Sequence, residues 1–261
     1  MLLTIDIGNT NIVLGVFENK KLIQHWRIVT KQEKTEDEYG ILISNLYQSS
    51  NIDISSTTGV IISSVVPPMV RTMEMLCNKF FKHKPMFVGP GVKTGMPIRY
   101  DNPHEVGADR IVNAVAAFER HRNSLVVVDF GTATTFDYIS PQGEYMGGAI
   151  APGIGVASEA LFKMASKLPR IELIKPESVI GKNTIASLQA GIVYGYIAMV
   201  DGIVNKIRRE VKTDPRIVAT GGMAGFIAEG SETIDEVDDL LTLTGLRLIY
   251  EKNIDGQRID D

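Results

Sequence analysis

A pattern that occurs twice, 123 residues apart, limits the possible folds of this chain more than any other feature. One apolar run ends at Asp6 and Gly8, and a second apolar run ends at Asp129 and Gly131. Each Asp-x-Gly turn is followed by two further β-prone segments that a short polar turn connects. Repetition of a whole unit indicates duplication. The sequence therefore predicts an α/β protein of two similar lobes, each of which contributes one aspartate loop to a cleft between them.

The helix and strand signals agree with this arrangement. Apolar residues at helical spacing and helix-start signals predict helices over 35–49, 67–81, 105–121, 156–165, 184–211 and 239–252. Strands are predicted between these helices, and an irregular stretch over 89–103 is long enough to be functional. We expect the boundary near residues 122–124, with an N-terminal lobe over 1–122 and a C-terminal lobe over 123–261.

The composition excludes several classes of protein. The chain has 261 residues, of which 44% are hydrophobic, so it can bury a core and is not a disordered chain. Its 27 basic and 31 acidic residues give a net charge of −4, which argues against nucleic acid as a partner. The single cysteine, Cys77, excludes a disulfide framework and a multi-thiolate metal site. The chain has no apolar run that resembles a signal peptide or a membrane span, so we expect a cytoplasmic protein without a membrane partner.

The two aspartate loops carry residues that suit phosphate binding. Glycine lets the backbone approach a phosphate closely, and backbone N–H groups can hold the phosphate oxygens together with hydroxyl and amide side chains. The first loop continues with Asn9, Thr10 and Asn11, and the second continues with Thr132. Asp6 stands at a strand end, where its carboxylate can hold Mg²⁺ directly or through water. Each loop alone also suits an ordinary polar hairpin, but their matched occurrence favours a binding function.

Two further segments contain candidate contacts with a substrate. Gly221 and Gly222 join a strand to a helix, where small residues leave room for a flat ring such as adenine. Asp109 lies in the segment Gly107–Arg110, which begins a helix directly after the irregular stretch. Its carboxylate can accept a proton from a substrate hydroxyl, and the neighbouring arginine can hold an anion. A simple strand-to-helix turn, and an acidic residue favoured by the helix dipole, explain the same residues without a function.

Together, these segments resemble the phosphate and adenosine motifs of the acetate and sugar kinase, Hsp70 and actin superfamily. Within it, the chain is most similar to the type III pantothenate kinases. The segments that carry this similarity, in the family's order, are DIGNTN (6–11), GADR (107–110), DFGTATTFD (129–137), GGAIAPG (147–153), ATGGMA (219–224) and LTLTGLRLIYEKN (241–253). The resemblance implies two ribonuclease H-like (actin-like ATPase) lobes with a cleft between them. It also implies an enzyme that phosphorylates pantothenate with ATP to 4′-phosphopantothenate, the first step of coenzyme A biosynthesis.

The resemblance implies roles for particular residues as well. It makes Asp109 the general base that takes the proton of the pantothenate hydroxyl. It implies pantothenate contacts from Tyr100, Gly107, Ala108, Asp109, Arg110 and Thr184. It implies ATP contacts from Asp6, Ile7, Gly8, Asn9, Thr10, Asn11, Ile12, Val13, Thr132, Gly221 and Gly222. Asp129 would be a ligand of a monovalent cation, K⁺ or NH₄⁺, and Asp6 would help to position Mg²⁺ beside ATP.

The family forms homodimers, and one predicted helix offers a surface for this. Tyr194, Tyr196 and Met199 on the helix over 184–211 can present an apolar face to a second copy, although they suit core packing equally well. Thr184, at the start of the same helix, is also placed to act as its N-cap, and that role is compatible with a pantothenate contact.

Two other functions are compatible with the residues. A kinase of the same fold could act on another alcohol such as a sugar, and some relatives of these kinases are non-catalytic regulatory proteins. Asp109 favours an alcohol acceptor, because a carboxylate acceptor needs no base. The presence of Asp6, Asp109 and Asp129 together argues against a non-catalytic protein.

Overall fold

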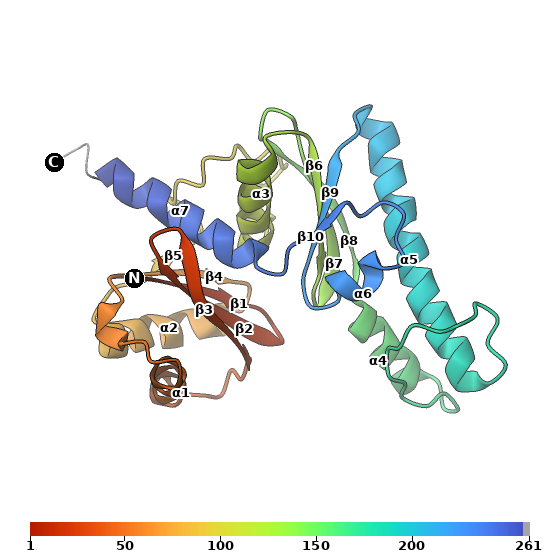
Figure 1. The fold of residues 1–261 in the computed structure, drawn as a ribbon, viewed down its shortest axis with the longest axis horizontal. Coiled ribbons are helices and arrows are strands. Elements are labelled where there is room, and N and C mark those ends of the chain that lie inside the picture. Colours follow the sequence, from red (N-terminus) through yellow and green to blue (C-terminus); the bar gives the residue numbers. More distant parts are fainter. Residues whose placement is uncertain (258–261) are drawn as a thin grey trace. The chain divides into compact units, whose positions relative to one another are not determined.

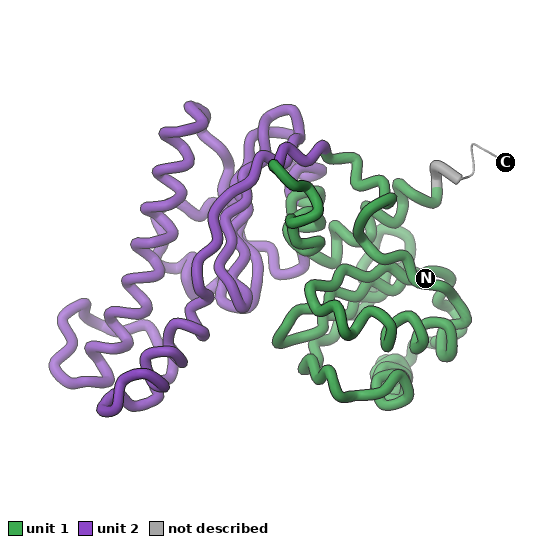
Figure 2. The backbone as a smooth tube through the Cα atoms, turned by 180° about the vertical axis from the view of Figure 1, so that it is seen from behind, with its two compact units in different colours: residues 1–96, 101–116, 241–261 green, residues 97–100, 117–240 purple. Residues whose placement is uncertain are grey.

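Residues 1–257 are described by a computed structural model, in which the chain divides into two units (Figure 2). Unit 1 comprises residues 1–96, 101–116 and the chain from 241 onward, and unit 2 comprises 97–100 and 117–240. The chain therefore passes between the units at several points, whereas we expected one boundary near residues 122–124. Each unit is described below by itself.

Unit 1 is built on a five-stranded sheet in the order β3-β2-β1-β4-β5 (Figure 1). Its strands are β1 (Leu2–Ile7), β2 (Asn11–Glu18), β3 (Lys21–Val29), β4 (Gly59–Ser64) and β5 (Met86–Phe87). The central strand β1 pairs antiparallel with β2 and parallel with β4. The helices of this unit are α1 (Glu36–Ser49), α2 (Pro67–Leu76), the first part of α3 (Ala108–His121) and α7 (Leu241–Gln257). A π-helical turn over Cys77–Phe81 extends α2.

The alternation of side chains along β1 explains why helices cover both faces of this sheet. Leu3, Ile5 and Ile7 point to one face and are buried in a core that includes apolar side chains of α1 and α2. The opposite face is packed against α7, whose Leu243 lies close to Gly15 of β2. The start of α1 follows the predicted capping box, since Thr35 and Glu38 form both of its hydrogen bonds.

Unit 2 is built on a second five-stranded sheet, in the order β10-β9-β6-β7-β8. Its strands are β6 (Leu125–Phe130), β7 (Ala133–Ile139), β8 (Tyr145–Pro152), β9 (Arg216–Thr220) and β10 (Glu236–Val237). Its helices are α4 (Ile154–Met164), α5 (Thr184–Val211) and α6 (Ala224–Ala228). One face of the sheet is packed against α5 and α6 through a core that includes Val126, Val200 and Ile227.

The predicted duplication is confirmed by the two sheets. The order β3-β2-β1-β4-β5 in unit 1 corresponds, strand for strand, to β8-β7-β6-β9-β10 in unit 2. Like β1, the central strand β6 pairs antiparallel with the next strand and parallel with the one after the helical segment. Asp6 is paired with Val13 and Ser63, and Asp129 is paired with Thr135 and Thr220. The two aspartates therefore occupy equivalent positions at the ends of the central strands.

The last helix departs from the expected lobe assignment. We expected residues 123–261 to form one lobe, but α7 belongs to unit 1 and contacts β1, β2 and β4. Its buried residues Leu241, Leu243, Leu246 and Ile249 lie around more than half of the helix. The apolar residues of a helix do not specify which of two similar sheets it covers. The position of α7 in the chain therefore did not predict the unit to which it belongs.

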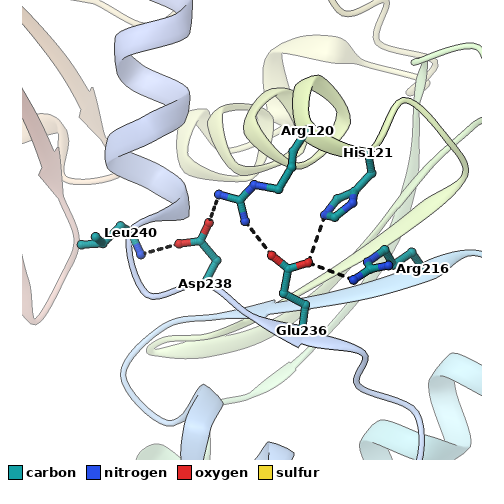
Figure 3. Close-up of polar contacts among 6 residues, drawn as sticks. All are labelled: Arg120, His121, Arg216, Glu236, Asp238 and Leu240. Atoms are coloured by element: carbon teal, nitrogen blue, oxygen red, sulfur yellow. Dashed lines mark hydrogen bonds and ion pairs between the residues drawn. The ribbon is translucent and has the colours of Figure 1, made fainter. Parts of the chain in front are cut away.

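A cluster of charged side chains in unit 2 joins the segment where the chain enters this unit, after residue 116, to the segment where it leaves, after residue 240 (Figure 3). Arg120, near the end of α3, donates to Glu236 at 2.6 Å and to Asp238 at 2.5 Å. Asp238 in turn accepts a hydrogen bond from the backbone N–H of Leu240 at 2.9 Å, just before the chain leaves unit 2. His121 and Arg216 also contact Glu236, each at 3.2 Å. This cluster holds the end of α3 beside the segment that leads into α7.

Burial and charge oppose each other in this cluster. Burial by itself would raise the pKa of Glu236, but the hydrogen bond from Arg120, the charge that His121 carries at acidic pH and the charge of Arg120 outweigh it and hold that pKa below its usual value. Burial lowers the pKa of His121, because it disfavours the protonated imidazole more than Glu236 favours it. Glu236 is therefore ionised, and His121 neutral, around pH 7.

The helix α5 runs over 184–211, as predicted, and is the one helix in the described range that is long and apolar enough to cross a membrane. This statement about a membrane span rests on the length and the composition of the helix only. The buried positions Ile192, Val193, Ile197, Val200 and Val204 instead join the core beneath the unit 2 sheet. The helix is therefore packed as part of a folded unit.

Candidate active site

The first aspartate loop is a tight turn at the end of β1. The backbone N–H of Gly8 donates to the carbonyl of Asn11 at 2.9 Å and closes the turn. Thr30, which follows β3, donates from its hydroxyl to the carbonyl of Gly8 at 2.7 Å and from its N–H to the carbonyl of Thr10 at 3.0 Å. Two loop carbonyls are thus bound from one side, while Asn9 and Thr10 are exposed. The predicted phosphate loop is therefore a fixed and accessible turn.

Asp109 lies in the first turn of α3, and its carboxylate folds back over Gly107. A Cβ atom on Gly107 would lie 2.5 Å from Oδ1 of Asp109. The same oxygen accepts a hydrogen bond from the backbone N–H of Arg110 at 2.8 Å. The helix N-terminus stabilises a carboxylate at this position, because the dipole and the first N–H groups favour negative charge. Glycine at 107 therefore provides the space in which this carboxylate lies.

The start of α3 lies at the same end of the unit 1 sheet as the first aspartate loop, where β1 and β4 end. A Cβ on Gly107 would lie 3.7 Å from Val65, and the N–H of Val65 donates to the carbonyl of Ile7 at 3.1 Å. Val65 follows β4, which runs parallel to β1, so both strands finish at this end of the sheet. Unit 1 therefore brings together the loop after Asp6 and the segment Gly107–Arg110. Within that segment Arg110 is buried, with 7% of its surface exposed.

The second aspartate loop is packed against two glycine turns. The N–H of Gly131 donates to the carbonyl of Ala133 at 3.0 Å, and the N–H of Gly153 donates to the carbonyl of Thr132 at 3.0 Å. A Cβ on Gly153 would lie 2.4 Å from the carbonyl oxygen of Gly131. A Cβ on Gly221 would lie 2.5 Å from Oδ1 of Asp129. Neither glycine can be replaced without moving the loop.

Gly221 is also required for its own conformation. Its φ angle is +92°, in the left-handed region that residues with a side chain rarely adopt. It directly follows Thr220, the residue of β9 that pairs with Asp129. Gly222 is exposed in the turn before the five-residue helix α6. Unit 2 therefore brings together Asp129, Thr132 and the Gly221–Gly222 turn.

Two of the expected pantothenate contacts lie elsewhere in unit 2. Tyr100 lies on the segment that joins the edge of the sheet beside β8. Thr184 is exposed at the start of α5, in a hollow that Leu168, Gly181 and Leu188 also line. Its expected N-cap role is wrong: the side chain of Asn183 accepts from the N–H of Ala186 and is the N-cap. The residue one position earlier was the better choice, because asparagine is as strong a capping residue as any.

The donor chemistry of the two aspartate loops suits the ions that the resemblance implies. Among residues 1–257, no group of three or more His, Cys, Asp or Glu side chains is placed to hold a metal ion. That is compatible with Mg²⁺ bound through one or two carboxylates and substrate phosphates, as is usual for this ion. The Asp129 loop offers a carboxylate and closely packed backbone carbonyls, which are the hard oxygen donors that an alkali cation needs.

A family model described as type III pantothenate kinase matches residues 2–206 of the chain. The chain belongs to the type III pantothenate kinase family. A relative from Geotalea uraniireducens, named type III pantothenate kinase, is 58% identical over 253 residues, which is 97% of this chain and 99% of that protein. A relative of the same name from Anaeromyxobacter dehalogenans is 60% identical over 97% of this chain and its own whole length.

Solved structures show the wider fold of this pantothenate kinase family member. A candidate Baf family transcriptional activator from Campylobacter jejuni has a TM-score of 0.61 at 19% identity, with 97% of this chain and 99% of that one covered. A candidate N-acetylglucosamine kinase from Porphyromonas gingivalis has a TM-score of 0.54 at 14% identity, with 97% and 99% covered. At these identities the likeness concerns the fold alone. It agrees with the expected actin-like α/β class.

Sequence reasoning missed the contacts that support these site residues. Gly153 lies in a segment that we quoted for the family resemblance, yet nothing in the sequence indicated that it packs on the loop of Thr132. Tyr145 and Asp137 were likewise not singled out, although both are buried and hydrogen-bonded to each other at 2.6 Å. An aspartate at an inward position of a predicted strand was the available signal, because a buried carboxylate needs partners.

Proposed function

We propose that this chain transfers the γ-phosphoryl group of ATP to the primary hydroxyl of pantothenate and forms 4′-phosphopantothenate, the first step of coenzyme A biosynthesis. Family membership over nearly the whole chain supports the reaction. The observation that carries the residue assignment is the carboxylate of Asp109, which is folded over Gly107 at the end of the sheet where the first aspartate loop also lies.

Asp109 is the proposed general base. A base in phosphoryl transfer to an alcohol accepts the hydroxyl proton as the oxygen attacks phosphorus. The carboxylate at the start of α3 is half-buried rather than sealed in the core, so it can meet a substrate. Its hydrogen bond with the N–H of Arg110 holds the carboxylate in a fixed orientation at the start of the helix.

The two aspartate loops are the proposed phosphate-binding elements. The proposed contacts of the ATP phosphates are Asp6 to Val13 and Thr132. The loop geometry supports this, because the Gly8 turn is closed by its own hydrogen bond and keeps Asn9 and Thr10 exposed. Asp6 would hold Mg²⁺, which offsets the charge of the phosphates during transfer. Gly221 and Gly222 would border the adenine.

A monovalent cation, K⁺ or NH₄⁺, is the second proposed ion, with Asp129 as its ligand. Support comes from the donor chemistry, because Oδ1 of Asp129 and the backbone carbonyl oxygen of Phe130 both lie beside Gly221 and are hard oxygen donors. A cation there would lie next to the phosphate loop that contains Thr132. It would supply positive charge to that loop, and Asp129 would hold it in place.

The acceptor contacts are proposed for Tyr100, Gly107, Ala108, Asp109, Arg110 and Thr184. Arg110 is one of the few buried charged residues of unit 1, which suits an anionic substrate better than a solvated arginine would. Pantothenate carries one carboxylate, and the guanidinium group of Arg110 is the proposed positive charge that binds it.

A homodimer in the cytoplasm is the proposed state of the protein. The surface formed by α4 and the start of α5 exposes Leu161, Phe162, Met164 and Ile185. Met199 lines a hollow on the same surface, whereas the hydroxyls of Tyr194 and Tyr196 donate to backbone carbonyls of this chain. Exposed apolar groups of this size commonly mark a protein interface. A second copy of the chain is the proposed occupant, with neither nucleic acid nor membrane as a partner.

An ATP-consumption assay with three acceptor conditions tests the proposed reaction. ADP release should require pantothenate, and a panel of sugars or the omission of any acceptor should give only background. Turnover with a sugar, or turnover that ignores pantothenate, would replace the proposal with the sugar kinase alternative. Binding of ATP without turnover in any condition would favour a regulatory protein.

A further inference from the structure

The segment Pro97–Tyr100 lies along the outer edge of the unit 2 sheet, although the residues on either side of it belong to unit 1. The N–H of Tyr145 donates to the carbonyl of Pro97 at 2.9 Å, and the N–H of Arg99 donates to the carbonyl of Tyr145 at 2.8 Å. Ile98 and Tyr145 thereby form a parallel bridge. Because β8 is the edge strand of its sheet, this segment covers backbone groups that would otherwise be exposed.

Alternation along the segment separates its side chains into an outer and an inner set. Arg99 is exposed and donates two hydrogen bonds to Oε1 of Glu144, at 2.9 and 2.6 Å. Ile98 and Tyr100 are half-buried. A shift of the segment by one residue would exchange these sets and break the ion pair. The Arg99–Glu144 pair therefore specifies the register in which Tyr100 is presented.

The inner side chain, Tyr100, fills a space that a glycine leaves open. A Cβ on Gly147 would lie 3.3 Å from Cε2 and 3.4 Å from Cδ2 of the Tyr100 ring. Gly147 also has a φ angle of +105°, which excludes most side chains. The ring of Tyr145 is the second neighbour, with its centroid 6.4 Å from that of Tyr100. The orientation of Tyr100 is therefore set by Gly147 and Tyr145.

Tyr145 is in turn fixed from within the sheet. It is fully buried, and its hydroxyl donates to Oδ1 of Asp137 at 2.6 Å. Thr135 donates to Oδ2 of the same carboxylate at 3.1 Å. A hydrogen bond to a buried carboxylate is stronger than one between neutral groups and orients both partners. A continuous set of contacts thus runs from Asp137 through Tyr145 to Tyr100.

The hydroxyl of Tyr100 itself makes no hydrogen bond with residues that the structure describes. Its ring is held on two sides while this polar group remains available, which is the arrangement expected of a side chain that contacts a small polar ligand.

We propose that Asp137, Tyr145 and Gly147 are positioning residues that set the orientation of Tyr100 toward the pantothenate acceptor, with Arg99 and Glu144 fixing the register of its segment. This inference rests on the proposed function and on the proposed contact between Tyr100 and pantothenate. It adds residues that act through Tyr100 and do not touch the substrate.

The test is steady-state kinetics of the full-length enzyme with Tyr145→Phe, which removes one hydroxyl group. The matched control is Tyr47→Phe, because Tyr47 is also fully buried and hydrogen-bonded, to Thr57 at 3.2 Å in unit 1. We expect Tyr145→Phe to raise the KM for pantothenate about tenfold, the effect of one lost hydrogen bond to a charged group. The KM for ATP and kcat should stay within about twofold, and the control should leave all three within the same range.

A charge exchange tests the same inference without a change in the core. Glu144→Arg alone should raise the KM for pantothenate, and Glu144→Arg combined with Arg99→Glu should bring it back toward the wild-type value. This pair is exposed, so both variants should fold even where Tyr145→Phe does not. Failure of the exchange to restore KM, or an unchanged KM in Tyr145→Phe, would overturn the inference.

These outcomes are distinct from a failure of the proposed function. A wild-type enzyme that does not turn over pantothenate would overturn both proposals. A wild-type enzyme that does, together with variants whose pantothenate KM is unchanged, would overturn this inference alone. A parallel rise in both KM values and a fall in kcat would also count against it, because that pattern indicates general disruption of the fold.

Discussion

The variant Gly107→Ala tests whether the position of the proposed base, Asp109, matters for catalysis, because it moves the carboxylate and does not remove it. The new methyl group would lie 2.5 Å from Oδ1 of Asp109 and 3.7 Å from the Val65 side chain. Non-bonded heavy atoms settle at about 3.5 Å or more, so the carboxylate has to move by roughly 1 Å. The distance to Val65 is an ordinary contact. The substitution therefore displaces the Asp109 carboxylate while the carboxylate itself, and the packing around it, remain.

The expected result is a large loss of turnover with little loss of stability. A misplacement of about 1 Å in a catalytic group can cost roughly 100-fold in rate. Gly107 does not have a left-handed φ angle, so alanine introduces no backbone strain there. We expect kcat with pantothenate to fall about 100-fold, and the free energy of unfolding to change by less than about 1 kcal/mol. ADP release measures the first quantity, and denaturant unfolding measures the second.

Two other glycine substitutions provide the controls. Gly202→Ala on α5 places its methyl group where no atom lies within 4 Å, so it should leave activity unchanged and raise stability by about 0.5–1 kcal/mol, because alanine favours a helix more than glycine does. Gly245→Ala on α7 would place a Cβ 2.1 Å from the backbone carbonyl oxygen of Val112, so it should lower stability. If Gly107→Ala keeps at least half of the wild-type kcat, the position of the Asp109 carboxylate does not matter and its role as base is refuted.

Four further predictions follow from the same structure. Asp109→Asn should keep the fold and ATP binding but lower kcat by about 10²–10⁴-fold, and full turnover would refute the assignment. Replacement of K⁺ by Na⁺ should lower turnover, and equal rates in both salts would remove the proposed cation role of Asp129. Gly245→Ala should destabilise the protein by about 1–3 kcal/mol in denaturant unfolding, since the backbone of α3 has to move. Arg120→Ala removes the ion pairs with Glu236 and Asp238 and should lower the free energy of unfolding at pH 7. The loss should be only about 1 kcal/mol, because the guanidinium group is partly exposed and solvent screens its charge. The pKa of Glu236 is held below its usual value, so its stabilising effect is present above that value and is lost as the pH falls through its lowered pKa. The difference between Arg120→Ala and wild type should therefore shrink between pH 7 and about pH 3, and a difference that grows on acidification would contradict the ionic account.

Local patterns predicted the elements and the duplication well, because their signals lie within a few residues. The capping box at Thr35 gave the start of α1, and the apolar spacing over 184–211 gave the bounds of α5. The helix predicted from residue 105 begins at Ala108 instead, after a 3-10 turn over Pro103–Glu105. The short strand β10 was missed, since two residues carry no periodic signal. The matched Asp-x-Gly turns correctly indicated two sheets with the same strand order.

Pairings between distant segments could not be predicted in the same way. Nothing near Pro97–Tyr100 indicates that these residues would cover the edge of β8, because an extended segment can pair with any open strand edge. The positions of Tyr100 and Tyr145 depend on that pairing, and so the supporting contacts of the candidate site stayed hidden. The aspartates were easier to find, since each is fixed by the turn that immediately follows its own strand.

The packing of α7 has a physical consequence for the candidate base. Leu243 and Leu246 of α7 are buried in unit 1, and Gly245 between them packs directly on Val112 of α3. Thr242 also donates to the side chain of Asn113 at 2.7 Å. These contacts lie one turn beyond Asp109 on α3, so the last helix of the chain holds the helix whose first turn carries the proposed base. A change on α7 can therefore alter catalysis without any contact with substrate, and Gly245→Ala should lower kcat as well as stability. A destabilised Gly245→Ala variant with wild-type kcat, measured well below its unfolding temperature, would show that the position of α3 is set by other contacts.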